Sequence, residues 1–314
     1  MTKNIIAVAG PTASGKTALA ARLALEIGGE VISNDSMQIY KGMEIGCATP
    51  TADEMLGVPH HLLSFVSPTE DFSCADYGEL AKKTADEVIA RGKTPVFCGG
   101  TGLYLDSVIT VGSLGDGEKD EALRERLTRM AEAEGCEAVH SYLREIDPEA
   151  AEAIHPNNVR RVIRAIEIFE TTGVTKTEWD RRSKEVEPPY RAKIIVLDFL
   201  SRELLYERIE KRVDLMLAAG LENEARGLFE ADLLRESAPA YQAIGYKEML
   251  PYLRGEESLA DAADRIKQNT RRYAKRQMTW FRRYKDAVVI HPDDGEKMRD
   301  FEDIVAEALE KIRR

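Results

Sequence analysis

A glycine-rich octapeptide near the start of the chain has residue types suited to binding phosphate. The segment GPTASGKT, residues 10–17, fits the pattern G-x-x-x-x-G-K-[ST] between an apolar run and a helical stretch. Its glycines let backbone N–H groups turn inward, and the following helix offers its positive end. An ordinary glycine turn is the alternative, but this context favours a phosphate site, with Lys16 as a charge and Thr17 as a metal-binding hydroxyl. The predicted site comprises Gly10, Pro11, Thr12, Ala13, Ser14, Gly15, Lys16 and Thr17.

A carboxylate and a hydroxyl follow two other apolar runs. Asp35 ends EVISND, and Thr101 follows the two glycines of TPVFCGG. A lone Asp is ordinarily a solvated or capping group, but at a strand's carboxyl end facing a phosphate loop its natural task is to accept a proton. Thr101 could contact a bound group, or it could be incidental to a glycine turn. No Asp follows VFCGG, and this weakens the hypothesis of a nucleotide hydrolase, which uses such an acid to hold Mg²⁺.

A later helical stretch, SRELLYERIEKRVDLMLAAG, contains closely spaced cations. Arg208, Lys211 and Arg212 could be surface charge, as helical Arg and Lys commonly are. An enzyme with a phosphate leaving group, however, needs a cation to stabilise the charge that develops on it. One of these three residues is a candidate for that role.

The cationic residues are unevenly distributed along the chain. The net charge is −11, yet residues 265–285 contain nine Lys/Arg and no Asp/Glu, so the remainder carries −20. This window also contains Tyr273, Trp280, Phe281 and Tyr284. Cations with aromatic side chains that stack on unpaired bases are typical of proteins that bind RNA loops. A solvated helix face with its aromatic residues in the core is the alternative.

The elements that must position these residues follow a βαβ rhythm. Apolar runs predict strands at 4–10, 30–35, 94–100, 193–199 and 287–292, with helical stretches between most of them. Nearly continuous apolar strands are expected when helices cover both faces of a sheet, so we predict an α/β fold with a doubly wound parallel sheet. The ends of the first three runs should then meet at one crevice.

A long helical segment separates the third and fourth strands. Residues 115–190 show helical periodicity without strand-like alternation, so we predict a core of residues 1–114 and 191–314 with a helical insertion at 115–190. Within the insertion, VRRVIRAIEIFETT predicts a helix that Asn157 or Asn158 caps and Gly173 ends. Arg160, Arg161 and Arg164 on its polar side could extend an RNA surface.

Composition excludes several classes of protein. No apolar run approaches the ~20 residues of a membrane span, and MTKN leads into a strand with no visible secretory signal, so we expect a cytoplasmic protein and no membrane partner. The four cysteines form no C-x-x-C and are expected to be buried thiols. Adjacent His60 and His61 lack a further ligand at metal-binding spacing, so we interpret them as a packed turn. No exposed apolar stripe demands a partner, which favours a monomer.

The order of several motifs resembles that of the bacterial tRNA dimethylallyltransferases, also called tRNA isopentenyltransferases. The motifs are GPTASGKT, ISNDSMQIYKGMEIGCATPT, VPHHLL, GGTGLY, HPNNVRRVIRAIEIFETTG, AIGYKE and TRRYAKRQMTWFRR, and they span nearly the whole chain. The resemblance implies a P-loop kinase-like core with a helical insertion. It also implies transfer of a dimethylallyl group from dimethylallyl diphosphate to N6 of adenosine 37 in the anticodon stem-loop of tRNA, with diphosphate released and Mg²⁺ assisting.

The resemblance further implies roles for individual residues. Asp35 would be the general base, Thr101 its neighbour at the reacting centre, and Arg212 the cation that steadies the departing diphosphate held by the loop and Mg²⁺. The implied tRNA contacts are Asp35, Ser36, Met37, Gln38, Thr101, Arg124, Arg160, Arg161, Val162, Ile163, Arg164, Gln242, Gly245, Lys247, Lys275, Arg276, Gln277, Trp280 and Arg282. This division suits the chemistry, because an exocyclic adenine amine is a poor nucleophile that needs a proton acceptor and a stabilised leaving group.

Two other functions remain open at this point. A small-molecule kinase that uses ATP would explain the loop, Asp35 and Arg212. It would not explain the cluster of cations at residues 265–285, called the basic window below. A non-catalytic RNA-binding protein would explain the basic window but not the motifs at three strand ends.

Overall fold

The computed structural model describes residues 3–110 and 119–313, and the chain divides into two compact units. One unit comprises Met1–Val108 with Tyr190–Arg314, and the other comprises Ile109–Pro189. The boundary expected at residue 115 lies outside the described residues. Each unit is considered by itself below.

The first unit contains a six-stranded parallel sheet with the order β3-β2-β4-β1-β5-β6. Its strands are β1 (Lys3–Ala9), β2 (Glu30–Ser33), β3 (His60–His61), β4 (Pro95–Gly99), β5 (Tyr190–Leu197) and β6 (Val288–Ile290). The register pairs Ala9 with Gly99 and Ser33 with Cys98, so β1, β2 and β4 end at one edge. All five predicted strands and their parallel arrangement are therefore confirmed.

The edge strand β3 was not predicted from the sequence. His60 and His61 pair with Val31 and Ile32 of β2, so the interpretation of these histidines as a packed turn was wrong. A strand of two residues is too short to show the alternation by which strands are recognised.

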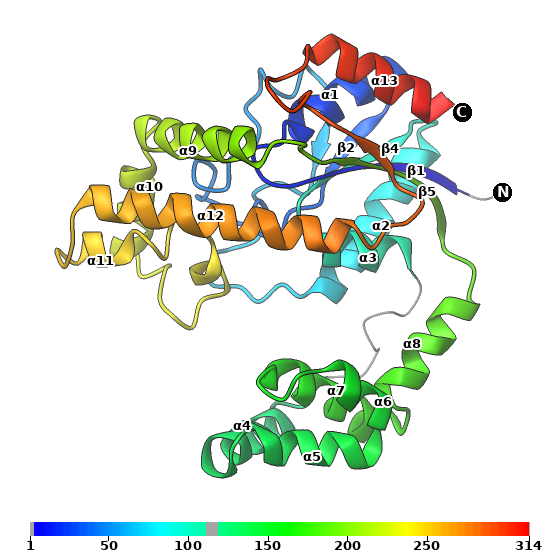
Figure 1. Ribbon diagram of the computed structural model, residues 1–314, viewed down its shortest axis with the longest axis vertical. Helices are drawn as coiled ribbons and strands as arrows, with labels where there is room; N and C mark the ends of the chain where they lie inside the picture. The colour runs from blue at the N-terminus through cyan, green and yellow to red at the C-terminus, as the bar shows by residue number, and fades with distance from the viewer. Residues whose placement is uncertain (1–2, 111–118, 314) are drawn as a thin grey trace. The chain divides into compact units, whose positions relative to one another are not determined.

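Helices cover both faces of this sheet. Its helices are α1 (Lys16–Ile27), α2 (Cys74–Ala90), α3 (Gly102–Ile109), α9 (Arg202–Ala218), α10 (Leu221–Glu230), α11 (Leu250–Leu253), α12 (Leu259–Phe281) and α13 (Phe301–Arg313). Figure 1 shows α1 and α13 on one face and α2, α3 and α12 on the other. Val8 of β1 packs with Leu19 of α1, while its neighbour Ala9 packs with Phe281 of α12. This two-sided burial explains the continuous apolar runs of the strands.

The regular secondary structure of the second unit is entirely helical within its described residues. It consists of α4 (Glu121–Glu134), α5 (Cys136–Ile146), α6 (Pro148–Ala153), α7 (Val159–Thr172) and α8 (Lys176–Glu185). Gly173 ends α7 in a left-handed conformation, as expected. Asn158 occupies the N-cap position of α7, but its side chain makes no capping hydrogen bond, which corrects that part of the prediction. Across residues 3–110 and 119–313, no helix has the length and apolar character needed to cross a membrane.

Candidate active site

A pocket of about 320 Å³ opens at the edge of the sheet where β1, β2 and β4 end. Thr12, Lys16 and Thr17 of the glycine-rich loop line it, together with Asp35 and Arg212. The expected convergence of strand ends is thus confirmed for the loop and for Asp35. Arg212 of α9 joins them from a segment far along the chain.

The glycine-rich loop connects β1 to α1 and is held by contacts to other elements. Gly15 adopts φ 91° immediately before the helix, a conformation that favours glycine. Ala13 is also left-handed, with φ 62°, which is uncommon for a residue with a side chain. Its carbonyl accepts a hydrogen bond from Nε of Arg208 at 2.8 Å. Arg208, which the sequence could not separate from surface charge, therefore supports the loop from α9.

Two cations and one hydroxyl near the loop, those of Lys16, Arg212 and Ser14, lack a partner, in the part of the chain that the structure describes, of the kind that a bound anion would provide. Lys16 is only 9% exposed, and its Nζ donates only a long hydrogen bond, 3.3 Å, to the carbonyl of Pro11. Burial lowers the pKa of Lys16, and the nearby charge of Arg212 lowers it further. Burial also lowers the pKa of Arg212. Among the described residues, neither cation forms an ion pair, and the buried hydroxyl of Ser14 has no hydrogen-bond partner.

These features have one electrostatic consequence. Two desolvated cations side by side are unfavourable, and an anion between them restores the charged form of both. The backbone N–H groups that begin α1 point the same way, because the first amides of a helix have no partner within it. This end of the pocket is therefore suited to phosphate.

Asp35 lies two residues beyond β2, where its carboxylate lines the pocket. Its Oδ1 accepts a hydrogen bond from the backbone N–H of Met37 at 2.9 Å, which fixes the orientation of the carboxylate. No hydrogen bond to its other oxygen is found within the described part of the chain. Asp35 thus retains an acceptor for a proton from a bound molecule.

Thr101 contacts Ser36, the residue that follows Asp35 in the chain. Its Oγ1 accepts a hydrogen bond from the N–H of Ser36 at 3.0 Å and donates to the hydroxyl of Ser36 at 3.3 Å. The hydroxyl of Thr101 helps to hold the turn that carries Asp35, and its expected contact with the reacting groups stays a prediction. These two contacts position Ser36 and, through it, the turn that begins at Asp35.

Apolar side chains also line the pocket, which the sequence did not indicate. Tyr273, on α12, lies close enough to Asp35 for the carboxylate to raise the pKa of its hydroxyl, although burial is the larger cause. The expected contact residues Ser36, Met37, Gln38, Gln242, Gly245 and Lys247 also line the pocket. The apolar lining consists of Met37, Leu63, Val213, Met216, Ile244 and Ile266. A ligand with both a phosphate group and a hydrocarbon group would match this mixed lining.

Mg²⁺ is the metal that the resemblance implied, through Thr17. Within the described residues, no three His, Cys, Asp or Glu side chains are grouped to hold a metal ion. Mg²⁺ commonly takes one or two protein ligands and completes its shell with phosphate oxygens and water. The hydroxyl of Thr17, which lines the pocket, and the phosphate-binding character of the loop are compatible with that mode.

The basic window lies on α12 and just beyond it, and its charge is partly neutralised by acids elsewhere. Ion pairs join Arg265 to Glu257, Lys267 to Asp214, Arg271 to Glu210, Arg282 to Asp198 and Arg283 to Asp106. Arg272, Lys275, Arg276 and Lys285 are exposed and have no ion pair within the described chain. The free positive surface is therefore smaller than the sequence suggested.

The aromatic residues of this window mostly serve the core. Phe281 is buried, and Tyr284 donates a hydrogen bond to Asp106 at 2.5 Å, so the expectation that they stack on bases was wrong. Trp280 packs against Gly102 and beneath the guanidinium of Arg283, and its assignment as a tRNA contact stays a prediction. Gln277 is buried, with both ends of its amide bonded within the protein, and its assignment likewise stays a prediction.

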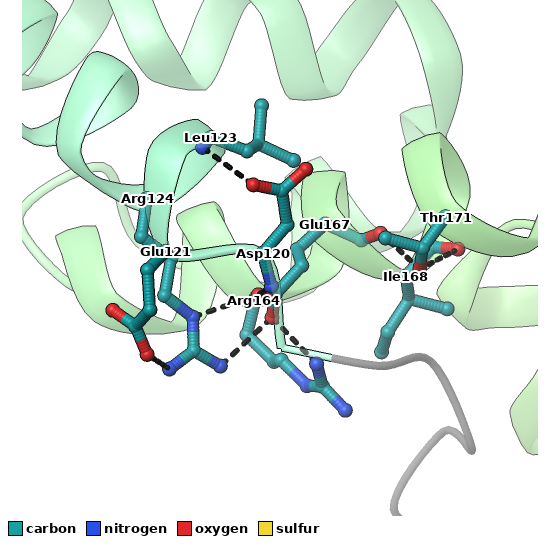
Figure 2. Close-up of polar contacts among 8 residues, drawn as sticks. All are labelled: Asp120, Glu121, Leu123, Arg124, Arg164, Glu167, Ile168 and Thr171. Carbon is teal, nitrogen blue, oxygen red and sulfur yellow. Dashed lines mark hydrogen bonds and ion pairs between the residues drawn. The ribbon is translucent and has the colours of Figure 1, made fainter.

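In the helical unit, a buried carboxylate holds two of the expected tRNA contacts. Arg124 binds Glu167 through two hydrogen bonds of 2.7 and 2.9 Å, and Arg164 binds the same carboxylate (Figure 2). The guanidinium of Arg124 is thus used within the protein, and its assignment as a tRNA contact stays a prediction. Val162 and Ile163 lie in the core of the unit, so they offer no side-chain contact. Arg160 and Arg161 are exposed.

Replacing Glu167 with Gln is expected to destabilise the protein in a pH-dependent manner. Burial alone would raise the pKa of Glu167, but hydrogen bonds from Arg124 and Arg164 hold it below the usual 4.5. The ionised form therefore stabilises the fold above pH 4.5, and this contribution is lost as pH falls through the lowered pKa. We expect a loss of about 1.5–3 kcal/mol at neutral pH, the range for hydrogen bonds to a charged group.

Thermal unfolding followed between about pH 3 and pH 7 measures this effect, because that range covers the titration of an ordinary carboxyl group. The matched control is Glu132→Gln, an exposed glutamate on α4, for which we expect little change. An equal loss of stability in Glu167→Gln at every pH would contradict an ionic role for Glu167.

Together, the sheet, the loop and the pocket define an α/β protein with a phosphate-binding pocket at the carboxyl edge of its parallel strands. The chain belongs to the IPP transferase family, whose model matches residues 38–284. A second model, described as isopentenyl transferase, matches residues 3–65.

Curated relatives cover nearly the whole chain. A tRNA dimethylallyltransferase of Halalkalibacterium halodurans is 46% identical over 99% of this chain and 99% of its own. One from Geobacillus thermodenitrificans is 47% identical over 95% of this chain and 93% of its own.

Solved structures agree in fold. The tRNA isopentenylpyrophosphate transferase of Bacillus halodurans is 44% identical with a TM-score of 0.73, covering 99% of this chain and 96% of its own. A eukaryotic dimethylallyltransferase acting on tRNA is 29% identical with a TM-score of 0.79, covering 93% of this chain and 75% of its own.

Proposed function

We propose that this protein transfers a dimethylallyl group from dimethylallyl diphosphate to N6 of adenosine 37 in tRNA and releases diphosphate. Support comes from family membership and from relatives named tRNA dimethylallyltransferase at 46% identity over nearly the full length. The observation that carries the proposal is one pocket in which the Asp35 carboxylate, the unpaired Lys16 and Arg212, and an apolar wall occur together. The core is proposed to be a P-loop kinase-like domain, with 109–189 as its helical insertion.

The residues of the pocket divide the reaction between them. Asp35 accepts the proton of the N6 amine as the nitrogen forms its bond to the allylic carbon. The carbon–oxygen bond to diphosphate breaks, and the electron pair leaves with the diphosphate. Lys16, Arg212 and the amides at the start of α1 stabilise the charge that develops on those oxygens. When bound, Mg²⁺ supplies further neutralisation of the diphosphate, and Thr17 would help to hold it.

The apolar wall favours this reaction over phosphoryl transfer from ATP. Val213, Met216 and Ile266 contact the pocket, and burial of a short hydrocarbon against them contributes about 0.8 kcal/mol per methylene. A kinase with a polar substrate would leave this surface exposed to water. We therefore favour an allylic diphosphate as the donor.

Binding of tRNA is proposed to use the exposed cations and the pocket rim. Arg160 and Arg161 on α7, and Lys275, Arg276 and Arg282 at α12, are exposed and suited to phosphate contacts. The anticodon stem-loop is the part of tRNA that we propose is bound, by a monomeric protein in the cytoplasm, where tRNA is found.

Incubating the protein with unmodified tRNA and dimethylallyl diphosphate, then analysing the nucleosides by mass spectrometry, tests the proposed function. We expect the mass of one dimethylallyl group to be added to adenosine and an equal amount of diphosphate to be released. Turnover of ATP without tRNA, and no gain of mass on adenosine, would instead support the kinase.

Charge reversal on α12 is expected to weaken tRNA binding in a salt-dependent way. Arg272 and Lys275 are exposed, form no ion pair among the described residues and do not line the pocket. In the variant Arg272→Glu with Lys275→Glu, each lost phosphate contact should lower the salt slope of the binding constant by about one. Fluorescence anisotropy with labelled tRNA at several salt concentrations measures both quantities.

The control makes the same change of net charge elsewhere. Arg254→Glu with Lys297→Glu reverses two exposed cations outside the basic window, and we expect it to bind tRNA nearly as the wild type does. Equal weakening by both double variants would show that overall charge, rather than this surface, governs binding.

A further inference from the structure

Gln277 of α12 bonds to the backbone of the phosphate loop at Thr12. We propose that Gln277 is a specificity-determining residue, which makes the loop accept two phosphates and reject a third. This inference rests on the proposed function, in which the donor is a diphosphate. It concerns a residue whose position in the basic window suggested a contact with RNA.

The amide of Gln277 joins the loop to the end of β4. Its Oε1 accepts a hydrogen bond from the backbone N–H of Thr12 at 2.8 Å, and its Nε2 donates to the carbonyl of Gly100 at 3.0 Å. The side chain is only 4% exposed and forms part of the pocket lining. Both bonds require this orientation of the amide, because the loop offers a donor and Gly100 an acceptor.

Gly100 leaves the space that this amide occupies. A Cβ atom at Gly100 would lie 2.0 Å from Nε2 of Gln277, much closer than two such atoms can approach. The strand end and the α12 side chain are therefore matched in shape. A substitution at either position should displace the amide.

The bond to Thr12 removes one donor from the first half of the loop. Loops of this kind hold phosphates through successive backbone N–H groups and the following lysine. Here the N–H of Thr12 is bonded to Gln277, and the N–H of Ser14 to the carbonyl of Pro11 at 3.3 Å. The described chain shows no hydrogen-bond partner for the N–H of Ala13, and the other amides that remain lie at the start of α1, next to Lys16.

The consequence is an anion site of limited length. A diphosphate can use the start of α1, Lys16 and Arg212 without disturbing Gln277. A third phosphate extending along the loop would meet the carbonyl oxygen of Gln277 instead of the N–H of Thr12, and two acceptors repel one another. The same loop that binds a nucleoside triphosphate in other proteins is thus restricted to a diphosphate here.

Binding of inorganic diphosphate and inorganic triphosphate, each with Mg²⁺, tests the inference because the two anions differ by one phosphate group. Isothermal titration calorimetry on the full chain gives the ratio of the two dissociation constants. In Gln277→Met, a side chain of similar length without an amide, the preference for diphosphate should fall by about tenfold, the effect of one hydrogen bond to a charged group. Gly100→Ala, which displaces the amide without altering it, should shift the ratio in the same direction.

Gln268→Met is the matched control, since Gln268 is an exposed glutamine on the same helix. It should keep the wild-type ratio. If folded Gln277→Met and Gly100→Ala both keep that ratio, or weaken the two anions equally, the inference is overturned and Gln277 is only a packing residue. A wild-type protein that binds neither anion would overturn the diphosphate site itself, whereas a shifted ratio without prenyl transfer would overturn the proposed function alone.

Discussion

Replacing Asp35 with Ala is expected to slow prenyl transfer by about 10²–10⁴-fold, the range for loss of a general base. Asp35 is the acid that we assign as the proton acceptor, and Met37 orients it through its backbone N–H. Without that acceptor, the adenine amine would have to form its bond while keeping its proton. Asp35→Asn should cause a similar loss, since the amide keeps the shape of the side chain but has no basic oxygen.

Single-turnover kinetics with labelled dimethylallyl diphosphate and excess enzyme measure this step apart from product release. The affinity for tRNA should remain within a few-fold of wild type, which separates chemistry from binding. Asp53→Asn, at an exposed acid in the neighbouring loop, is the control and should retain full activity. Transfer at the wild-type rate by either Asp35 variant would remove Asp35 as the base.

Replacing Arg212 with Met is expected to lower kcat by about 10²–10³-fold, as when one stabilising donor is removed from a developing oxyanion. Arg212 lines the pocket, lies close to Lys16 and has no ion pair within the described residues. Its charge is therefore available to the departing diphosphate. Arg212→Lys should recover part of the rate, because the charge remains while the planar fork of donors is lost.

Steady-state kinetics over a range of donor concentrations distinguish two roles for Arg212. A fall in kcat with little change in KM indicates an interaction made mainly in the transition state. A rise in KM alone would show that Arg212 binds the donor without assisting its departure. Lys211→Met changes the exposed neighbour on α9 and should leave both constants near wild type.

Functional residues that lie close together in the sequence were predictable. The loop 10–17 depends on a short segment between one strand and one helix, so its pattern carries most of the information needed for its shape. The strands that frame it were predictable for a similar reason, because burial on both faces selects continuous apolar runs. Asp35 could be assigned from its place after such a run.

Residues that act through distant partners were not predictable. The cations of α9 had similar sequence surroundings, and only the packing of α9 separates Arg208, which supports the loop at Ala13, from Arg212, which lines the pocket. The aromatic residues of the segment 265–285 had a pattern typical of RNA binding, yet Phe281 packs against the sheet and Tyr284 bonds to Asp106. A helix pattern indicates which residues share a face but not what covers that face.

The sequence by itself determined that this is an α/β protein with a phosphate loop, an acid at a neighbouring strand end and a segregated basic segment, because each of these is a local pattern. Only the tertiary structure decided that Glu167 engages Arg124, that Thr101 holds the turn of Asp35, and that Gln277 closes the loop at Thr12. The last of these contacts joins residues 265 positions apart. Hydrogen bonds act over about 3 Å, so such pairs exist only after the fold has brought distant segments together.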